Sequence, residues 1–260
     1  MIHITHGAWQ PTPKPVHTDH LISAIGDVHG RADLLEPLME ALAADLGKPG
    51  VDHATNIFLG DLIDRGPDSL NVLGLAAGGL AAFARDPDSV ADIVLMGNHD
   101  RWLRDCLLGE PELSEIETWL ANGAETTLTS FGLTALPAPD AIPTRLREVA
   151  PEIVLELMGQ LKTHHRIGDW MFVHAGLDPR HPLEDQDEQA LLWIRDAFLE
   201  PADGWPFEVV VVHGHTPEEP YEEPTVVNHR INLDTGAFFS NVLTAVQMRD
   251  DKIRFVQATG

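Results

Sequence analysis

The stretch "LISAIGDVHG" (residues 21–30) begins with a short apolar run and ends in small and polar residues that include Asp27 and His29. An apolar run that stops at a Gly-Asp pair predicts a buried strand followed by a loop. Across residues 31–46, leucine and methionine recur at spacings of three and four, which predicts a helix with one apolar face. The stretch therefore opens a strand–loop–helix unit with polar side chains in its loop.

The same unit returns twice further along the chain. "NIFLGD" (56–61) precedes a helix that we expect to open at Pro67, because proline is favoured in a first helical turn. "ADIVLMGN" (91–98) precedes a helix through Trp102 and Leu107. Three successive units of this kind predict an α/β fold with a largely parallel, buried sheet.

The rest of the chain departs from this pattern. We interpret residues 110–165 as a helical cap, with helical stretches expected at 116–120, 125–131 and 145–163. "WMFVHAG" (170–176) and "FEVVVVHGHTP" (207–217) predict two further strands that end in histidine-containing loops, with a helix near 189–198 between them. Short β-branched runs predict a closing antiparallel β region at 225–227, 230–233, 242–248 and 253–256.

Length and composition bound the class of protein. The 260 residues suit one α/β domain, which we place at 21–260, while residues 1–20, which carry three prolines and four histidines, are expected to form a flexible extension. The net charge of −24 disfavours nucleic acid and anionic membranes as partners, because such a surface repels polyanions. A single cysteine, Cys106, together with no recognisable targeting signal and no apolar run of about 18–20 residues, favours a cytoplasmic protein.

Polar side chains that can bind metals or move protons follow five of the predicted strands. They are Asp27 and His29, Asp61 and Asp64, Asn98 and His99, His174, and His215. Because ligands of open α/β sheets bind beyond the carboxyl ends of the strands, we expect one shared site. Aspartate, histidine and asparagine without sulfur suit divalent ions such as Mn²⁺, Fe²⁺ or Zn²⁺. So many ligands exceed the need of one four-coordinate metal that keeps an open position, and two metals that share a carboxylate fit better.

Five short motifs occur in order along the chain: "GDVHG" (26–30), "GDLIDRG" (60–66), "GNHD" (97–100), "VHAG" (173–176) and "HGHT" (213–216). With these motifs the sequence resembles the calcineurin-like metallophosphoesterases. The Asp-Arg-Gly extension of the second motif resembles the phosphoprotein-phosphatase branch, which includes bacterial Ser/Thr protein phosphatases and the related symmetrical diadenosine tetraphosphatases. The resemblance implies a central β-sandwich with flanking helices and a helical cap insertion.

The resemblance also implies a centre with two divalent metal ions, bridged by Asp61. We expect Mn²⁺, with iron, zinc and nickel as alternatives. The implied ligands are Asp27, His29, Asp61, Asn98, His174 and His215. Water between two metals has a lowered pKa, so the implied nucleophile is a hydroxide that attacks phosphorus directly.

The remaining implied roles concern proton transfer and phosphate binding. His99 is the implied general acid, and Asp64 orients its imidazole and raises its pKa. Arg65 and Arg195 are expected to bind the non-bridging phosphate oxygens, because a planar guanidinium matches a phosphate.

Three further residues lie beside the motifs. Position 100 is Asp where the branch usually has Glu, and we expect the shorter carboxylate to be tolerated. His213 is interpreted as a supporting group or an occasional ligand. Asp234, in "DTGA" (234–237), is interpreted as support for the site and not as a ligand.

The implied activity is hydrolysis of phosphomonoesters, with phosphoserine or phosphothreonine in proteins as the favoured substrate. The alternative is hydrolysis of diadenosine tetraphosphate by the same residues, and the motifs do not separate the two. A catalytically silent phosphate-binding scaffold is a third hypothesis, which predicts a lost ligand or a lost general acid, and none is lost. The expected partner is accordingly a phosphorylated protein or a small phosphoester, bound by a monomer.

Overall fold

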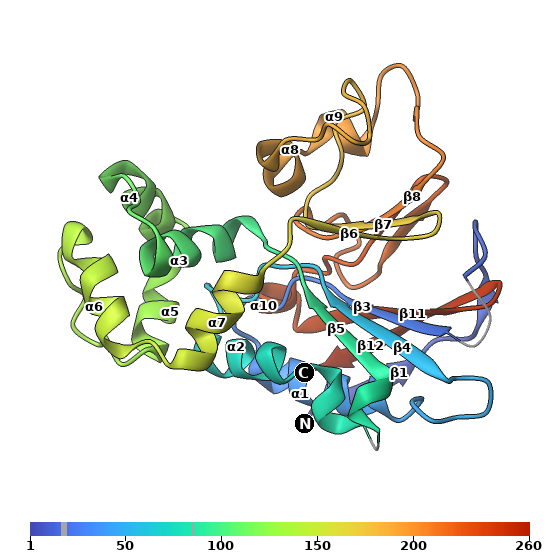
Figure 1. Cartoon of the computed structure of the whole chain (residues 1–260), viewed down its shortest axis with the longest axis horizontal. Coiled ribbons are helices and arrows are strands. Elements are labelled where there is room, and N and C mark those ends of the chain that lie inside the picture. The colour runs from blue at the N-terminus through green and yellow to red at the C-terminus, as the bar shows by residue number, and fades with distance from the viewer. Residues whose placement is uncertain (17–19, 85) are drawn as a thin grey trace.

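Two β-sheets stacked face to face form the centre of the protein (Figure 1). The structure is a computed structural model, and it describes residues 1–16, 20–84 and 86–260. The order of the first sheet is β1 (His3–His6), β12 (Lys252–Thr259), β11 (Val242–Arg249), β3 (His20–Ile25), β4 (His53–Phe58) and β5 (Val90–Val94), and β2 (Gln10–Pro11) pairs with β12. The order of the second is β6 (His164–Ile167), β7 (Trp170–Val173), β8 (Val210–His213), β10 (Arg230–Asn232) and β9 (Thr225–Val227).

Parallel strands form the middle of both sheets. In the first sheet β3, β4 and β5 run parallel, as the three strand–loop–helix units predict. In the second sheet β7, β8 and β10 run parallel. The apolar faces meet between the sheets, where Ile22 and Ile57 of the first pack in one core with Phe172 and Val212 of the second. The predicted α/β fold with a central β-sandwich is confirmed.

Helices cover the outer face of the first sheet and extend to one side of it (Figure 1). They are α1 (Ala32–Ala43), α2 (Ser69–Gly78), α3 (Asn98–Leu108), α4 (Leu113–Ala121), α5 (Ala124–Ser130), α6 (Ile142–Val149) and α7 (Glu152–Gln160), with short 3₁₀ turns at Leu80–Phe83, Pro87–Ser89 and Pro139–Ala141. The segment expected to form the cap contains α4 to α7. Three short helices follow in the C-terminal part: α8 (Glu188–Trp193), α9 (Asp196–Leu199) and α10 (Ala237–Ser240). Of the helices in the described ranges, none is both long and apolar enough to cross a bilayer.

Some element boundaries differ from the sequence-based expectation. The helix expected over 145–163 is two helices, because Pro151 disfavours helical geometry at Ala150, whose ψ is 127°. The helix expected over 189–198 is likewise interrupted, at Ile194, which has an extended backbone. The expected closing antiparallel region is divided between the sheets, and β10 runs parallel to β8.

The N-terminal segment also differs from the extension that we expected. Strands β1 and β2 pair antiparallel with β12, which would otherwise present the free backbone groups of an edge strand. Short polar strands such as "HITH" carry no apolar alternation, so the sequence pattern does not reveal this pairing. Residues 17–19 of the expected extension lie outside the described residues.

Candidate active site

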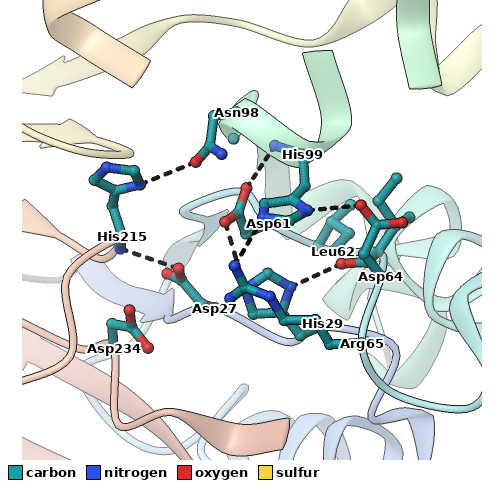
Figure 2. Close-up of polar contacts among 12 residues, drawn as sticks. Asp27, His29, Asp61, Leu62, Asp64, Arg65, Asn98, His99, His215 and Asp234 are labelled. Carbon is teal, nitrogen blue, oxygen red and sulfur yellow. Dashed lines mark hydrogen bonds and ion pairs between the residues drawn. The ribbon is translucent and has the colours of Figure 1, made fainter. Parts of the chain in front are cut away.

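The predicted site residues come together where both sheets end (Figure 2). Asp27, Asp61 and Asn98 follow β3, β4 and β5 of the first sheet, and His174 and His215 follow β7 and β8 of the second. The backbone N–H of His215 donates to Oδ2 of Asp27 (3.0 Å), and Nε2 of His174 lies 3.0 Å from Oδ1 of Asn98. The site therefore joins the two sheets, and every one of these side chains is buried.

Several site residues have an unusual backbone. His29, Asp61, Asp64, Arg65 and His215 have φ angles between 44° and 72°, in the left-handed region that side chains other than glycine disfavour. Close packing of the loops accompanies this geometry, because a Cβ at position 214 would collide with Oδ1 of Asp27. Strained backbone of this kind persists where the surrounding structure over-determines it, and it clusters at functional sites.

The candidate metal ligands form two overlapping groups that share Asp61. Oδ2 of Asp61 lies 3.5 Å from Nε2 of His29, and Oδ1 lies 3.5 Å from Nε2 of His174. The groups that could hold an ion are His29, Asp61 and His99 on one side, and Asp61, His174 and His215 on the other. The carboxylate of Asp61 thus lies between the two groups, as a bridging ligand requires.

The imidazoles are oriented as metal ligands. Nδ1 of His29 donates to the carbonyl of Ile63 (2.8 Å), and Nδ1 of His174 donates to the carbonyl of Leu59 (3.0 Å). A neutral imidazole that uses Nδ1 in this way presents a lone pair on Nε2. Nε2 of His174 and Oδ1 of Asn98 then face each other as two acceptors, an arrangement that a shared cation would stabilise.

Unpartnered polar atoms support the same interpretation. Oδ1 of Asp27 and Nε2 of His215 are buried and have no hydrogen-bond partner in the described structure. A buried polar atom without a partner destabilises the fold, by roughly 1–3 kcal/mol. The oxygen and nitrogen donors of this site therefore fit divalent metal ions.

Burial keeps the candidate histidine ligands neutral. It lowers the pKa of His29 to about 3 and that of His215 to about 2, and it also lowers the pKa of His174. Burial raises the pKa of Asp27 well above its usual value, and the nearby carboxylates of Asp234 and Asp61 add to this. Burial alone would raise the pKa of Asp61 as well, but the surrounding histidines together hold it below its ordinary value. Neutral imidazoles bind metals readily, because their lone pairs are free of protons.

His99 and Asp64 form a short, buried pair. Nδ1 of His99 lies 2.6 Å from Oδ2 of Asp64, while the backbone N–H of His99 donates to Oδ1 of Asp61 (3.0 Å). Burial opposes the charge on His99, but the carboxylates of Asp61 and Asp64 outweigh it and raise the pKa of the imidazole above its ordinary value. The pair therefore favours the protonated form of the imidazole.

Two residues that the sequence analysis did not assign to the site hold Asp64 in place. The indole Nε1 of Trp119 donates to Oδ2 (2.7 Å), and Oγ1 of Thr127 donates to Oδ1 (2.6 Å). Neither residue lies in one of the five motifs, so no local sequence signal marks them. Both belong to helices of the expected cap segment, so α4 and α5 fix the carboxylate that orients His99.

The two predicted phosphate-binding arginines occupy different places. Arg65 lies in the centre, with Nη1 2.8 Å from Nε2 of His29 and Nη2 3.1 Å from Nε2 of His99, and its guanidinium stands 4.8 Å from the ring centroid of Phe238. Arg195 is exposed, and its Nη1 donates to Oγ1 of Thr216 (3.1 Å), next to the His215 loop. Both guanidinium groups thus lie beside candidate metal ligands, Arg65 against His29 and Arg195 against the carbonyl of His215.

The contacts of Asp100, Asp234 and His213 show what each of these residues does beside the site. Asp100 accepts hydrogen bonds from the backbone N–H groups of Leu62 (3.0 Å) and Gly97 (2.9 Å), so the shorter carboxylate ties two site loops together. Asp234 accepts from the N–H of Gly236 (3.0 Å). His213 lies outside the two groups of candidate ligands, because its ring packs on Phe198 and its Nδ1 bonds to the carbonyl of Gly214.

Comparison with known proteins identifies the family. Residues 20–239 match the family model described as calcineurin-like phosphoesterase, and the chain belongs to this family. It is a metal-dependent phosphoester hydrolase, as the motifs predict.

Two individual relatives are similar to the chain over most of its length. Over 245 residues the chain is 29% identical to a bis(5'-nucleosyl)-tetraphosphatase PrpE, designated asymmetrical, of Oceanobacillus iheyensis, covering 86% of this chain and 87% of the relative. It is 28% identical over 248 residues to the protein of the same name from Bacillus anthracis, with 86% and 88% covered.

Solved structures share the fold at low sequence identity. A candidate diadenosine tetraphosphatase has a TM-score of 0.59 at 22% identity, with 91% of this chain and 93% of that chain covered. A cold-active protein-tyrosine phosphatase of a psychrophilic Shewanella has a TM-score of 0.58 at 17% identity, with 93% and 81% covered.

Proposed function

We propose that the protein hydrolyses dinucleoside tetraphosphates asymmetrically, so that diadenosine tetraphosphate and water yield ATP and AMP. The observation that carries this proposal is similarity over 86% of the chain to relatives that bear this activity in their names. The phosphoprotein substrate that we expected from the resemblance has weaker support, because the protein-tyrosine phosphatase with a similar structure shares only the fold, at 17% identity. The phosphoprotein-phosphatase branch includes tetraphosphatases that cleave symmetrically. We propose asymmetrical cleavage instead, because the names of the similar relatives specify it.

We assign the metal centre to the residues predicted from the motifs. Two divalent ions, for which we propose Mn²⁺, would be held by Asp27, His29, Asp61, Asn98, His174 and His215. When bound, the ions supply positive charge to the reacting phosphoryl group and lower the pKa of water. The shared position of Asp61 and the unpartnered atoms of Asp27 and His215 support this assignment.

The chain's own residues provide the other half of the chemistry. His99 donates a proton from Nε2 to the leaving oxygen, while Asp64 holds Nδ1 and keeps the imidazole in one orientation. Arg65, whose guanidinium lies against His29 and His99, turns toward the non-bridging oxygens when a phosphate binds, and Arg195 approaches from the opposite loop. Two arginines thus bring positive charge to the phosphate inside a protein of net charge −24.

The first experiment measures turnover by metal-stripped and Mn²⁺-reconstituted protein. Diadenosine tetraphosphate and a phosphothreonine peptide are assayed side by side, and the nucleotide products are separated by ion-exchange chromatography. We expect metal-dependent conversion of the dinucleotide into equal amounts of ATP and AMP, with little release of phosphate from the peptide.

The Asp61→Asn variant serves as the control, because it should lose the centre and expose any contaminating phosphatase. Formation of two molecules of ADP per dinucleotide would show that cleavage is symmetrical and would contradict the proposed asymmetrical reaction. Preference for the peptide would restore the phosphoprotein hypothesis, and no turnover of either substrate would favour the silent scaffold.

A further inference from the structure

A cavity of about 400 Å³ lies between α4 of the helical cap and α8. Its walls are polar and largely exposed, with Ser114, Glu115 and Thr118 on α4 and Glu188 and Gln189 on α8. The remaining lining residues are Arg101, Trp102, Leu192 and Trp193. A volume of this size, with an apolar floor and a few polar groups, suits a small organic ligand.

The floor of this cavity adjoins the active site through its two tryptophans. The ring of Trp102 stands edge-on to His99 with 5.1 Å between centroids, and Trp193 stands edge-on to His215 at 6.3 Å. The two indoles also touch each other, at 5.2 Å. The cavity therefore begins one ring beyond the general acid and one ring beyond a candidate metal ligand.

The position of the cavity beside His99 can be compared with the path of the leaving group. In hydrolysis by direct attack, the leaving group departs opposite the nucleophile, and the general acid stands beside the leaving oxygen. The side of the centre that carries His99 is therefore the side where the leaving group lies. We propose, building on the function proposed above, that this cavity binds the nucleobase of the leaving nucleotide, stacked against the floor formed by Trp193 and Leu192.

Charge in the cavity favours a base and disfavours a phosphate. Arg101 is engaged in ion pairs with Asp105 and with Glu188, the latter at 2.8 Å. The carboxylate of Glu115 adds negative charge to the opposite wall. A purine combines a flat face for stacking on indole with amino groups that can donate to carboxylates, whereas a phosphate would be repelled here.

The test fills the cavity without altering a catalytic group. Thr118 is exposed on α4, and its hydroxyl donates to the carbonyl of Ser114 in the same helix (2.7 Å). Thr118→Trp should lower kcat/KM for diadenosine tetraphosphate at least tenfold. The matched control is Glu117→Trp, which places the same side chain on the same helix outside the cavity lining and should change kcat/KM less than twofold.

A binding measurement separates this proposal from the proposed function. The dissociation constants of ATP and of tripolyphosphate, which has no base, are measured by calorimetry on Mn²⁺-loaded protein while chromatography verifies that neither ligand is consumed. Thr118→Trp should raise the dissociation constant of ATP at least tenfold and that of tripolyphosphate less than twofold. Gln189→Trp, which fills the cavity from α8, should do the same and keeps the test valid if the first variant fails to fold.

The outcomes are distinct. Selective weakening of ATP with no turnover of the dinucleotide would leave the base site standing and overturn the proposed function. Turnover of the dinucleotide with ATP affinity unchanged in both filled variants would overturn the base site alone. An equal loss of affinity for ATP and for tripolyphosphate would also overturn the base site, because the substitutions would then affect binding of the phosphates and not of the base.

Discussion

His99 occupies the first turn of α3 with both ring nitrogens committed to defined neighbours. Nδ1 faces Asp64 at 2.6 Å, and Nε2 points to Arg65 and the centre of the site. Against the opposing effect of burial, the carboxylates of Asp61 and Asp64 raise the pKa of His99 above its ordinary value, which favours the protonated imidazole. A proton donor in this position matters most when the leaving oxygen is a strong base.

Replacement of His99 should expose that dependence. His99→Asn should lower kcat by about 10²–10⁴-fold for diadenosine tetraphosphate or an alkyl phosphate, and much less for p-nitrophenyl phosphate, whose leaving group needs little protonation. Metal content, measured by atomic spectroscopy, should stay unchanged. An equal loss of kcat with both kinds of substrate would refute the role of His99 as general acid.

At the scale of single elements, two helices of the cap contribute hydrogen bonds to the site. α4 and α5 send Trp119 and Thr127 to the two oxygens of Asp64, so the carboxylate that orients His99 is itself held by the cap. Trp119 is fully buried, and its indole lies on the side of α4 that faces the core. The position of α4 is thereby coupled to the orientation of His99, the proposed general acid.

Loss of the indole N–H should reduce catalysis without removing the fold. Trp119→Phe keeps an aromatic ring but leaves Asp64 one donor short, which should lower kcat about 3- to 10-fold, the value of one hydrogen bond of roughly 1 kcal/mol. The loss should be larger with a poor leaving group than with p-nitrophenyl phosphate. Trp205→Phe is the matched control, because it removes an indole donor that bonds to the carbonyl of Val209 (3.0 Å) away from Asp64. A uniform loss across substrates would make Trp119 a packing residue only.

The elements also show what sequence alone could and could not predict. The parallel strands and their helices follow from apolar runs and helical spacing, and the candidate ligands follow from short motifs at strand ends, where the neighbouring strand is close in sequence. Trp119 and Thr127 lie 55 and 63 residues from Asp64, and their contacts depend on how the cap folds back over the site. The pairing of β1 with β12 spans almost the whole chain, and no local pattern encodes it.

At the scale of the whole molecule, the net charge of the protein opposes the binding of an anionic substrate. The chain carries 41 acidic and 17 basic residues, and the substrate that we propose is itself a polyanion. We propose that two of the basic residues, Arg65 and Arg195, bind the phosphates. Arg101, which lines the proposed nucleobase cavity, is neutralised by ion pairs. The surface as a whole therefore repels the substrate, and attraction acts only at short range.

This distribution of charge predicts an unusual response to salt. Because screening weakens long-range repulsion between protein and substrate, kcat/KM for diadenosine tetraphosphate should rise about twofold as sodium chloride increases from about 20 to about 150 mM with Mn²⁺ kept saturating. The less charged p-nitrophenyl phosphate should respond more weakly, which controls for an effect of salt on the fold or on metal affinity. Initial rates at substrate concentrations well below KM measure the ratio directly. A steep fall of kcat/KM with salt would mean that the field of the site outweighs the net charge and steers the substrate from a distance, as it does in enzymes whose entrance is surrounded by cations.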